Sequence, residues 1–146
     1  MAQINPYLHF LGNTEEAFNF YKSVFGGEFA MLQKFGSMPV QEGSPELSDE
    51  DKNKIMHVAL QINDGNVLMA TDAIGEHAKD AVFGNNISLS IGADTKAEAD
   101  KIFNGLSDGG TITMPITDTF WGAYFGMCKD KFGIQWMVNF DYPQES

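Results

Sequence analysis

The sequence contains one cysteine, few basic residues and no long hydrophobic run. Cys128 stands alone among 146 residues, so neither an intrachain disulfide nor a CxxC site can form. Cysteine usage of this kind is typical of a reducing compartment, and we expect a cytoplasmic location. Nine Lys and Arg stand against 20 Asp and Glu, a formal net charge of −11 that disfavours binding to nucleic acid or anionic lipid.

Segments long and apolar enough to cross a membrane are also missing. The chain has no run of about 18 apolar residues. Its first residues, MAQINP, lack the basic and apolar regions of a signal peptide. We therefore expect no membrane interaction.

Hydrophobic residues make up 43% of the chain, which is enough for a folded core. Their periodicity predicts the same order of elements twice: a strand, a helix and three strands. The first set comprises a strand at 3–11, a helix from Asn13 or Thr14 to 25, and strands at 28–35, 55–63 and 66–72. The second comprises a strand at 86–93, a helix after Thr95, and strands at 111–116, 122–129 and 134–140.

The ends of the two predicted helices correspond to each other. Asn13 with Glu16, and Thr95 with Glu98, have the spacing of capping boxes. The pairs Gly26-Gly27 and 109–110 end the helices, because glycine adopts the left-handed conformation at little cost. These correspondences indicate two related modules.

The predicted fold class is α+β, with two βαβββ modules that form one structural domain. The first module spans 1–75 and the second spans 76–146. Residues 36–54 interrupt the first module with Gly36, Pro39, Gly43 and Pro45, and Ser48 begins a segment that favours one helical turn. This insertion is either a lid or a plain exposed loop.

Asp64-Gly65 favours a two-residue hairpin turn. In that register Asn63 opposes Asn66, and His57 opposes Asp72. A carboxylate beside an imidazole is half of a general-base arrangement, so we predict His57 and Asp72 as catalytic residues. The alternative is a hydrogen-bonded pair that holds the strand ends together.

The face that His57 occupies is ambiguous. Met56, Val58, Leu60 and Ile62 form one apolar face of this strand, which leaves His57 on the other. If the apolar face packs inward, His57 points into the ligand cleft. The same register places Met69 beside Leu60, so a cleft that contains Met69 would lie on the face away from His57.

Candidate ligand contacts also lie in the second module. Asn86 and Ser88 belong to a polar face of the predicted strand at 86–93. Trp121 and Tyr124 belong to an aromatic-rich C-terminal segment that suits a flat or apolar ligand. Trp136 shares its strand parity with Ile134 and Val138, so we expect it in the core.

Three segments together resemble a known superfamily: LGNTEEAFNFYKSVFGGE, KIMHVALQINDGNVLMATD and WGAYFGMCKDKFGIQWMVNF. They resemble the vicinal oxygen chelate superfamily (glyoxalase/bleomycin resistance/dioxygenase), and within it the PhnB-like branch, also labelled demethylubiquinone methyltransferase-like. The resemblance implies paired modules around a U-shaped mixed sheet with a ligand in its concavity. It also implies a homodimer.

In the superfamily's metalloenzymes, four His, Glu or Gln ligands come from strands one, four, five and eight. Counting along this chain places those positions at Pro6, Met69, Asn86 and Met137. These side chains do not suit a hard divalent cation. We therefore expect no metal, and we predict Met69 and Met137 as contacts to an organic ligand.

The function that the resemblance implies is metal-independent binding of a small molecule, as a binding module or as an enzyme. Two alternatives stay open: a metal-dependent lyase, isomerase or dioxygenase, and a drug-sequestering resistance protein. We predict no cofactor. S-adenosylmethionine in particular is not expected, because the glycine pairs end helices and do not form a phosphate-binding strand-to-helix loop.

Overall fold

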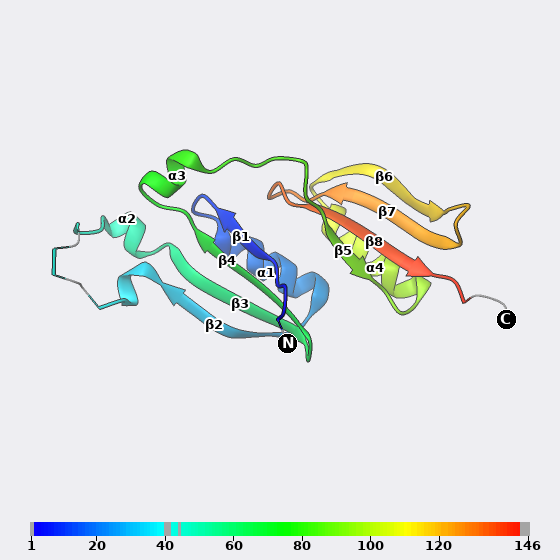
Figure 1. The fold of residues 1–146 in the computed structure, drawn as a ribbon, viewed down its shortest axis with the longest axis horizontal. Coiled ribbons are helices and arrows are strands. Elements are labelled where there is room, and N and C mark those ends of the chain that lie inside the picture. The colour runs from blue at the N-terminus through cyan, green and yellow to red at the C-terminus, as the bar shows by residue number, and fades with distance from the viewer. Residues whose placement is uncertain (1, 40–41, 44, 144–146) are drawn as a thin grey trace. The chain divides into compact units, whose positions relative to one another are not determined.

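The computed structural model describes residues 2–39, 42–43 and 45–143. The chain divides into two compact units, Met1–Val82 and Phe83–Ser146. Each unit contains one four-stranded sheet and one long helix (Figure 1).

The first unit forms a mixed sheet with the strand order β1-β4-β3-β2. Strand β1 is parallel to β4, and the other neighbours are antiparallel. Helix α1 packs on β3 and β4. The elements are β1 (Tyr7–Phe10), α1 (Thr14–Phe25), β2 (Glu28–Lys34), a 3-10 turn (Phe35–Ser37), α2 (Asp49–Lys52), β3 (Ile55–Asn63), β4 (Asn66–Asp72) and α3 (Glu76–Asp80).

The second unit repeats this scheme with the strand order β5-β8-β7-β6. Strand β5 is parallel to β8, and α4 packs mainly on β7 and β8. The elements are β5 (Leu89–Gly92), α4 (Lys96–Ser107), β6 (Thr111–Asp118), β7 (Ala123–Lys129) and β8 (Gln135–Asp141). The predicted α+β class and the repeated βαβββ order are confirmed.

A glycine with a left-handed φ angle follows each long helix: Gly26 comes directly after α1, whereas Asp108 separates α4 from Gly109. Gly26 and Gly109 have φ angles of 77° and 76°, which other residues rarely adopt. The next glycine in each unit lies against a backbone carbonyl. A Cβ on Gly27 would overlap the carbonyl oxygen of Gln61, and a Cβ on Gly110 would overlap that of Lys129. In both units this contact lets the strand after the helix begin close to its neighbour.

The two helices begin differently. The Thr95 hydroxyl accepts the Glu98 amide at 3.0 Å, and the Glu98 carboxylate accepts the Asp94 amide at 3.2 Å, so a capping interaction forms at α4. Asn13 makes no side-chain cap at α1, and that predicted capping box is wrong. Asp72 of β4 binds there instead.

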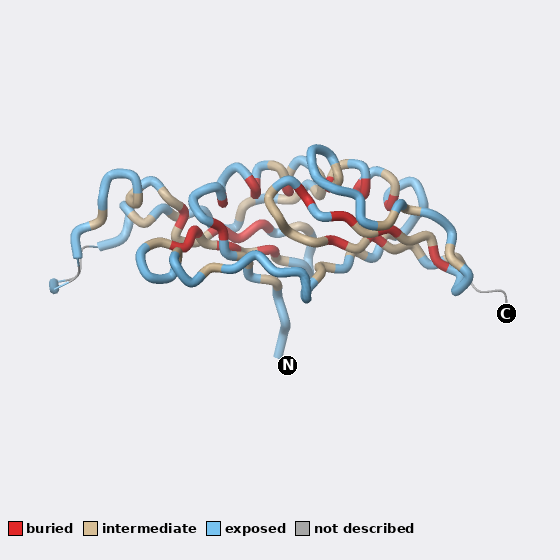
Figure 2. Tube along the Cα trace, turned by 90° about the horizontal axis from the view of Figure 1, so that it is seen from above, coloured by how far each residue is buried: buried red, intermediate tan, exposed pale blue. Residues whose placement is uncertain are grey.

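Each unit buries its core between the sheet and its long helix. Figure 2 shows buried residues along strands and helices, whereas connecting loops are mostly exposed. Trp136 is buried as predicted, and its Nε1 donates to the Asp130 carboxylate at 2.8 Å. Other large buried side chains are Phe10, Phe18, Tyr21, Val58 and Leu60 in the first unit, and Phe103, Leu106 and Val138 in the second.

The insertion contains the helical turn that the sequence predicts. Helix α2 begins after Ser48, whose hydroxyl accepts the Asp51 amide at 3.1 Å. Residues 40, 41 and 44 of the insertion lie outside the described residues. The lid role remains a prediction.

The longest helices, α1 and α4, have 12 residues each. In the part of the chain that the structure describes, no helix has the length and apolarity needed to span a membrane.

Candidate functional site

A β-bulge in the β3–β4 hairpin changes the predicted register. Asn63 faces Asn66 as expected, but Gln61 faces Val67, which leaves Ile62 as an extra residue. Beyond the bulge Val58 faces Ala70, so His57 lies level with Thr71. The predicted opposition of His57 and Asp72 is wrong, because the turn fixes only the first pair and one extra residue reverses side-chain parity.

The bulge also decides which side chains share a face. Met69 pairs with Ala59 on one side and with Tyr7 on the other, so all three point to the face that carries His57. Phe10 points to the opposite face, where its ring lies 6.5 Å from Phe18 of α1. Met69 and His57 therefore lie on the same face, whereas the register without a bulge placed Met69 with Leu60.

We call the surface away from α1 the open face of the first sheet. Two rows of side chains, aligned across its four strands, define it. The first row is His9, Thr71, His57 and Gln33, and the second is Tyr7, Met69, Ala59 and Met31.

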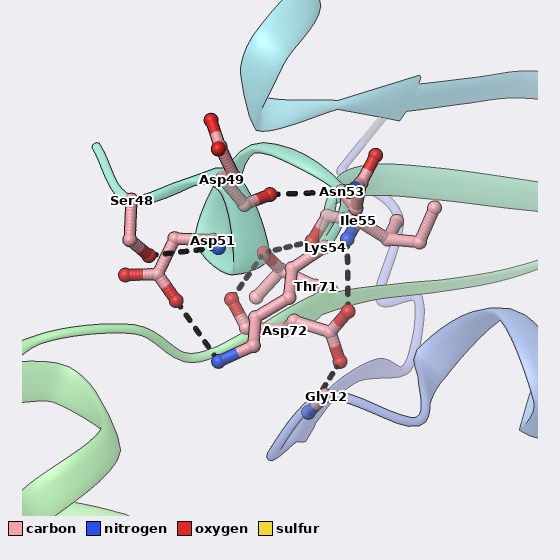
Figure 3. A network of polar contacts seen from close by, with 9 residues as sticks. All are labelled: Gly12, Ser48, Asp49, Asp51, Asn53, Lys54, Ile55, Thr71 and Asp72. Carbon is pink, nitrogen blue, oxygen red and sulfur yellow. Dashed lines mark hydrogen bonds and ion pairs between the residues drawn. The ribbon is translucent and has the colours of Figure 1, made fainter.

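Asp72 lies on the α1 side, and both of its carboxylate oxygens accept hydrogen bonds within the first unit. One carboxylate oxygen accepts the amides of Gly12 at 2.9 Å and Thr14 at 3.1 Å, and the Thr14 hydroxyl at 2.6 Å. The other accepts the Ile55 amide at 2.8 Å (Figure 3). Asp72 is 2% exposed. It therefore fixes the start of α1 to the start of β3, and it does not pair with His57.

Tyr7 is the centre of a polar cluster on the open face of the first sheet. Its hydroxyl lies 3.1 Å from Nδ1 of His57, across the intervening strand β4. The Tyr7 ring lies 5.6 Å from the His57 ring and 5.5 Å from the His9 ring. Burial raises the pKa of Tyr7, and a hydrogen bond with the Thr71 side chain lowers it in part. The phenol is therefore protonated at neutral pH and can donate to the imidazole.

The second sheet has a corresponding face away from α4. Ser90, Met137, Met127 and Met114 form one row across its four strands. Tyr7 and Ser90 thus occupy matching positions beside Met69 and Met137. Thioether side chains are flexible and polarizable, so such a row suits a variable apolar ligand.

The other predicted ligand contacts do not lie together in the second unit. Asn86 lies in a bend three residues before β5, so its predicted place on the strand is wrong, and Ser88 directly precedes β5. Tyr124 donates to Asp100 of α4 at 2.5 Å, so it points to the helix side. Trp121 is 54% exposed in the β6–β7 turn, and its ring lies 5.9 Å from that of Phe125.

Sequence reasoning missed Tyr7 and His9 as site residues. The signal was available in the segment YLHF, where Leu8 and Phe10 alternate with the two polar rings. Counting placed a superfamily ligand position at Pro6, whereas the residue that pairs with Met69 is Tyr7.

Comparison with known proteins places this architecture in the glyoxalase/bleomycin resistance/dioxygenase fold. A protein of that class from Burkholderia phytofirmans PsJN is 16% identical with a TM-score of 0.60, covering 93% of this chain and 97% of the other. This likeness concerns the fold alone.

The family is defined more narrowly. The model of the 3-demethylubiquinone-9 3-methyltransferase family matches residues 2–139, and the chain belongs to this PhnB-like family. Protein PA1353 from Pseudomonas aeruginosa is 40% identical with a TM-score of 0.80, covering 97% of this chain and 98% of the other. A putative 3-demethylubiquinone-9 3-methyltransferase, PhnB protein, from Bacillus cereus is 27% identical with a TM-score of 0.74, covering 95% and 99%. Protein YjdN from Escherichia coli (strain K12) is 29% identical over 93% of each chain.

Proposed function

We propose that this protein binds a small organic molecule on the open faces of its sheets and does so without a metal ion. The observation that supports this most strongly is the bulge at Ile62. It brings Tyr7, His57 and Met69 onto the sheet face that α1 leaves uncovered. A few hydrogen-bonding groups beside soft apolar side chains are the usual composition of a small-molecule site.

The donor chemistry supports a metal-free site. Met69 and Met137 contribute thioethers, and their strand partners Tyr7 and Ser90 contribute hydroxyls. Carboxylates and imidazoles are the ligands that divalent cations use in such enzymes. Within residues 2–39, 42–43 and 45–143, no three His, Cys, Asp or Glu side chains group as a metal site would require. The superfamily's metal does not fit these residues.

We also propose that S-adenosylmethionine is not a cofactor, although the family description names a methyltransferase. A nucleotide-type cofactor uses free amides in a glycine-rich strand-to-helix loop. The corresponding β1–α1 connection contains Gly12, whose amide is bound to Asp72, as is the amide of Thr14. These two amides are therefore not free for a phosphate or carboxylate.

We also propose that the protein forms a homodimer and is located in the cytoplasm. Strand β2 is an edge strand of its sheet, and its Met31 and Leu32 are 48% and 41% exposed. Exposed apolar edges favour pairing with another chain. Light scattering after gel filtration tests this, and a monomer at all concentrations would exclude it.

Methionine methyl NMR tests the binding proposal directly. Protein labelled with 13C at its methionine methyl groups is titrated with a library of small organic fragments. We expect binders to shift the Met69 or Met137 signals and to leave Met38, which follows the 3-10 turn, unchanged. A library without any selective shift, or stoichiometric metal in the purified protein by elemental analysis, would reject the proposal.

A further inference from the structure

We propose that the ligand of the open face of the first sheet carries an oxyanion, such as a carboxylate or a phosphonate, and that His57 and His9 recognise it while Tyr7 orients the ring of His57. This inference rests on the proposed function and names the chemical class of its ligand. It is argued from the contact between Tyr7 and His57 and from the distribution of charge on this face.

The contact between Tyr7 and His57 orients the imidazole. The Tyr7 hydroxyl lies 3.1 Å from Nδ1 of His57, and in this proposal the phenol donates to that nitrogen. A neutral imidazole that accepts at Nδ1 carries its own proton at Nε2. Among the described residues Nε2 has no hydrogen-bond partner, so this N–H is the donor that His57 offers to a ligand.

The second imidazole, that of His9, also lies on the open face of the first sheet. His9 is exposed, and its ring is 5.5 Å from the Tyr7 ring. Strand β4 contributes Thr71 and Met69 between the histidines, and β2 contributes Gln33 and Met31 at the outer edge. The two imidazole rings therefore lie next to side chains that carry no charge.

This face lacks carboxylates where the protein as a whole is rich in them. The chain has 20 Asp and Glu, yet neither row of the open face contains one. Strand β2 carries one acid, Glu28, which lies outside these rows beside Gln61, and its carboxylate pairs with Lys22 at 3.5 Å. Asp72 is on the opposite face and holds four donors. An anion here meets hydrogen-bond donors without an adjacent like charge, whereas a cation has no carboxylate to bind.

The test compares anionic and neutral probes that share a phenyl ring, and benzamide is the planar neutral counterpart of benzoate. Benzoate, phenylphosphonate and benzamide are titrated separately into protein labelled at methionine methyl groups and histidine nitrogens. We expect both anions to bind at least about tenfold more tightly than benzamide, because hydrogen bonds to a charged acceptor are stronger. The stronger of the two anions identifies the ligand class as a carboxylate or a phosphorus oxyanion.

Variants assign the effect to the cluster. His57→Gln should weaken anion binding about tenfold by removing one charge-assisted hydrogen bond. His77→Gln, on the exposed helix α3, should leave it unchanged. Tyr7→Phe should alter the nitrogen shifts of His57 in the free protein and weaken anion binding. Thermal melting confirms that each variant is folded.

The outcomes separate the two proposals. If benzamide binds as tightly as the anions and shifts the Met69 signal, the binding proposal stands and the oxyanion proposal is overturned. If the anions bind but His57→Gln and Tyr7→Phe bind them as the native chain does, the oxyanion proposal is also overturned. If neither anion shifts any signal of the open face, the oxyanion proposal is overturned. The fragment library then decides separately whether the face binds other molecules.

Discussion

Replacing Asp72 with Asn tests the role that the structure gives this buried carboxylate. An Asn amide can keep an oxygen where Asp72 accepts Gly12 and Thr14. Its NH₂ group then faces the Ile55 amide, which is also a donor. The substitution therefore leaves at least the Ile55 N–H without an acceptor and removes the charge from the other three hydrogen bonds.

The expected loss of stability follows from these contacts. One unpaired buried donor costs about 1–3 kcal/mol, and three hydrogen bonds that lose their charge assistance cost about 1 kcal/mol each. Because these contributions are coupled, we expect a net loss of about 4 kcal/mol. For a chain of this size that corresponds to a melting temperature lower by roughly 8–16 °C.

The assay must report on the first unit. Both tryptophans, Trp121 and Trp136, lie in the second unit, so their fluorescence would miss the effect. Far-UV circular dichroism during urea unfolding gives the stability, and hydrogen exchange identifies the amides that open. We expect Gly12 and Ile55 to lose protection.

A matched control is Asp80→Asn, which replaces an exposed carboxylate of α3 and should change the stability by less than about 0.5 kcal/mol. The reasoning is refuted if Asp72→Asn destabilises by less than about 1 kcal/mol with unchanged amide protection.

Three other substitutions test the second unit. Gly110→Ala should destabilise by about 3 kcal/mol or prevent folding, because its Cβ would overlap a backbone carbonyl of β7, whereas Gly92→Ala, with open space around it, should change urea stability little. Trp136→Phe should cost about 2 kcal/mol by leaving its buried carboxylate partner without the indole N–H, and equal stabilities would contradict this. The hydrogen bond to Asp100 raises the pKa of Tyr124 to about 12, so the folded state holds this proton above the ordinary value of 10.0. Stability should therefore fall as the pH rises from about 10 to 12, and less steeply in Tyr124→Phe by thermal melting; parallel profiles would refute the assignment.

Local sequence signals predicted the elements with short-range causes. Strands β3 and β4 begin and end at the predicted residues. Thr95 caps α4 by accepting the Glu98 amide, a contact within four residues of the chain that needs no distant partner. Where a prediction failed, a distant residue was involved: Asn13 does not cap α1, because Asp72 arrives from a strand 58 residues away from Thr14.

The candidate site was predicted only in part for the same reason. His57 and Met69 were both predicted as site residues, but a register without a bulge placed them on opposite faces, whereas the structure places them on the same face. Tyr7 reaches His57 across β4, a contact between residues 50 positions apart. Periodicity within one strand cannot reveal which side chain of a non-adjacent strand extends over it.

The amino-acid sequence by itself determined the repeated order of elements, the cap of α4 and the acidic, nearly cysteine-free character of the chain, because each depends on residues close together in sequence or on composition. The tertiary structure decided the site. One extra residue at Ile62 reverses the parity of β3, places His57 beside Tyr7 on the open face of the first sheet, and leaves Asp72 to hold the fold from the other face. Strand pairing fixes that parity, and it depends on packing between segments that are distant in the chain.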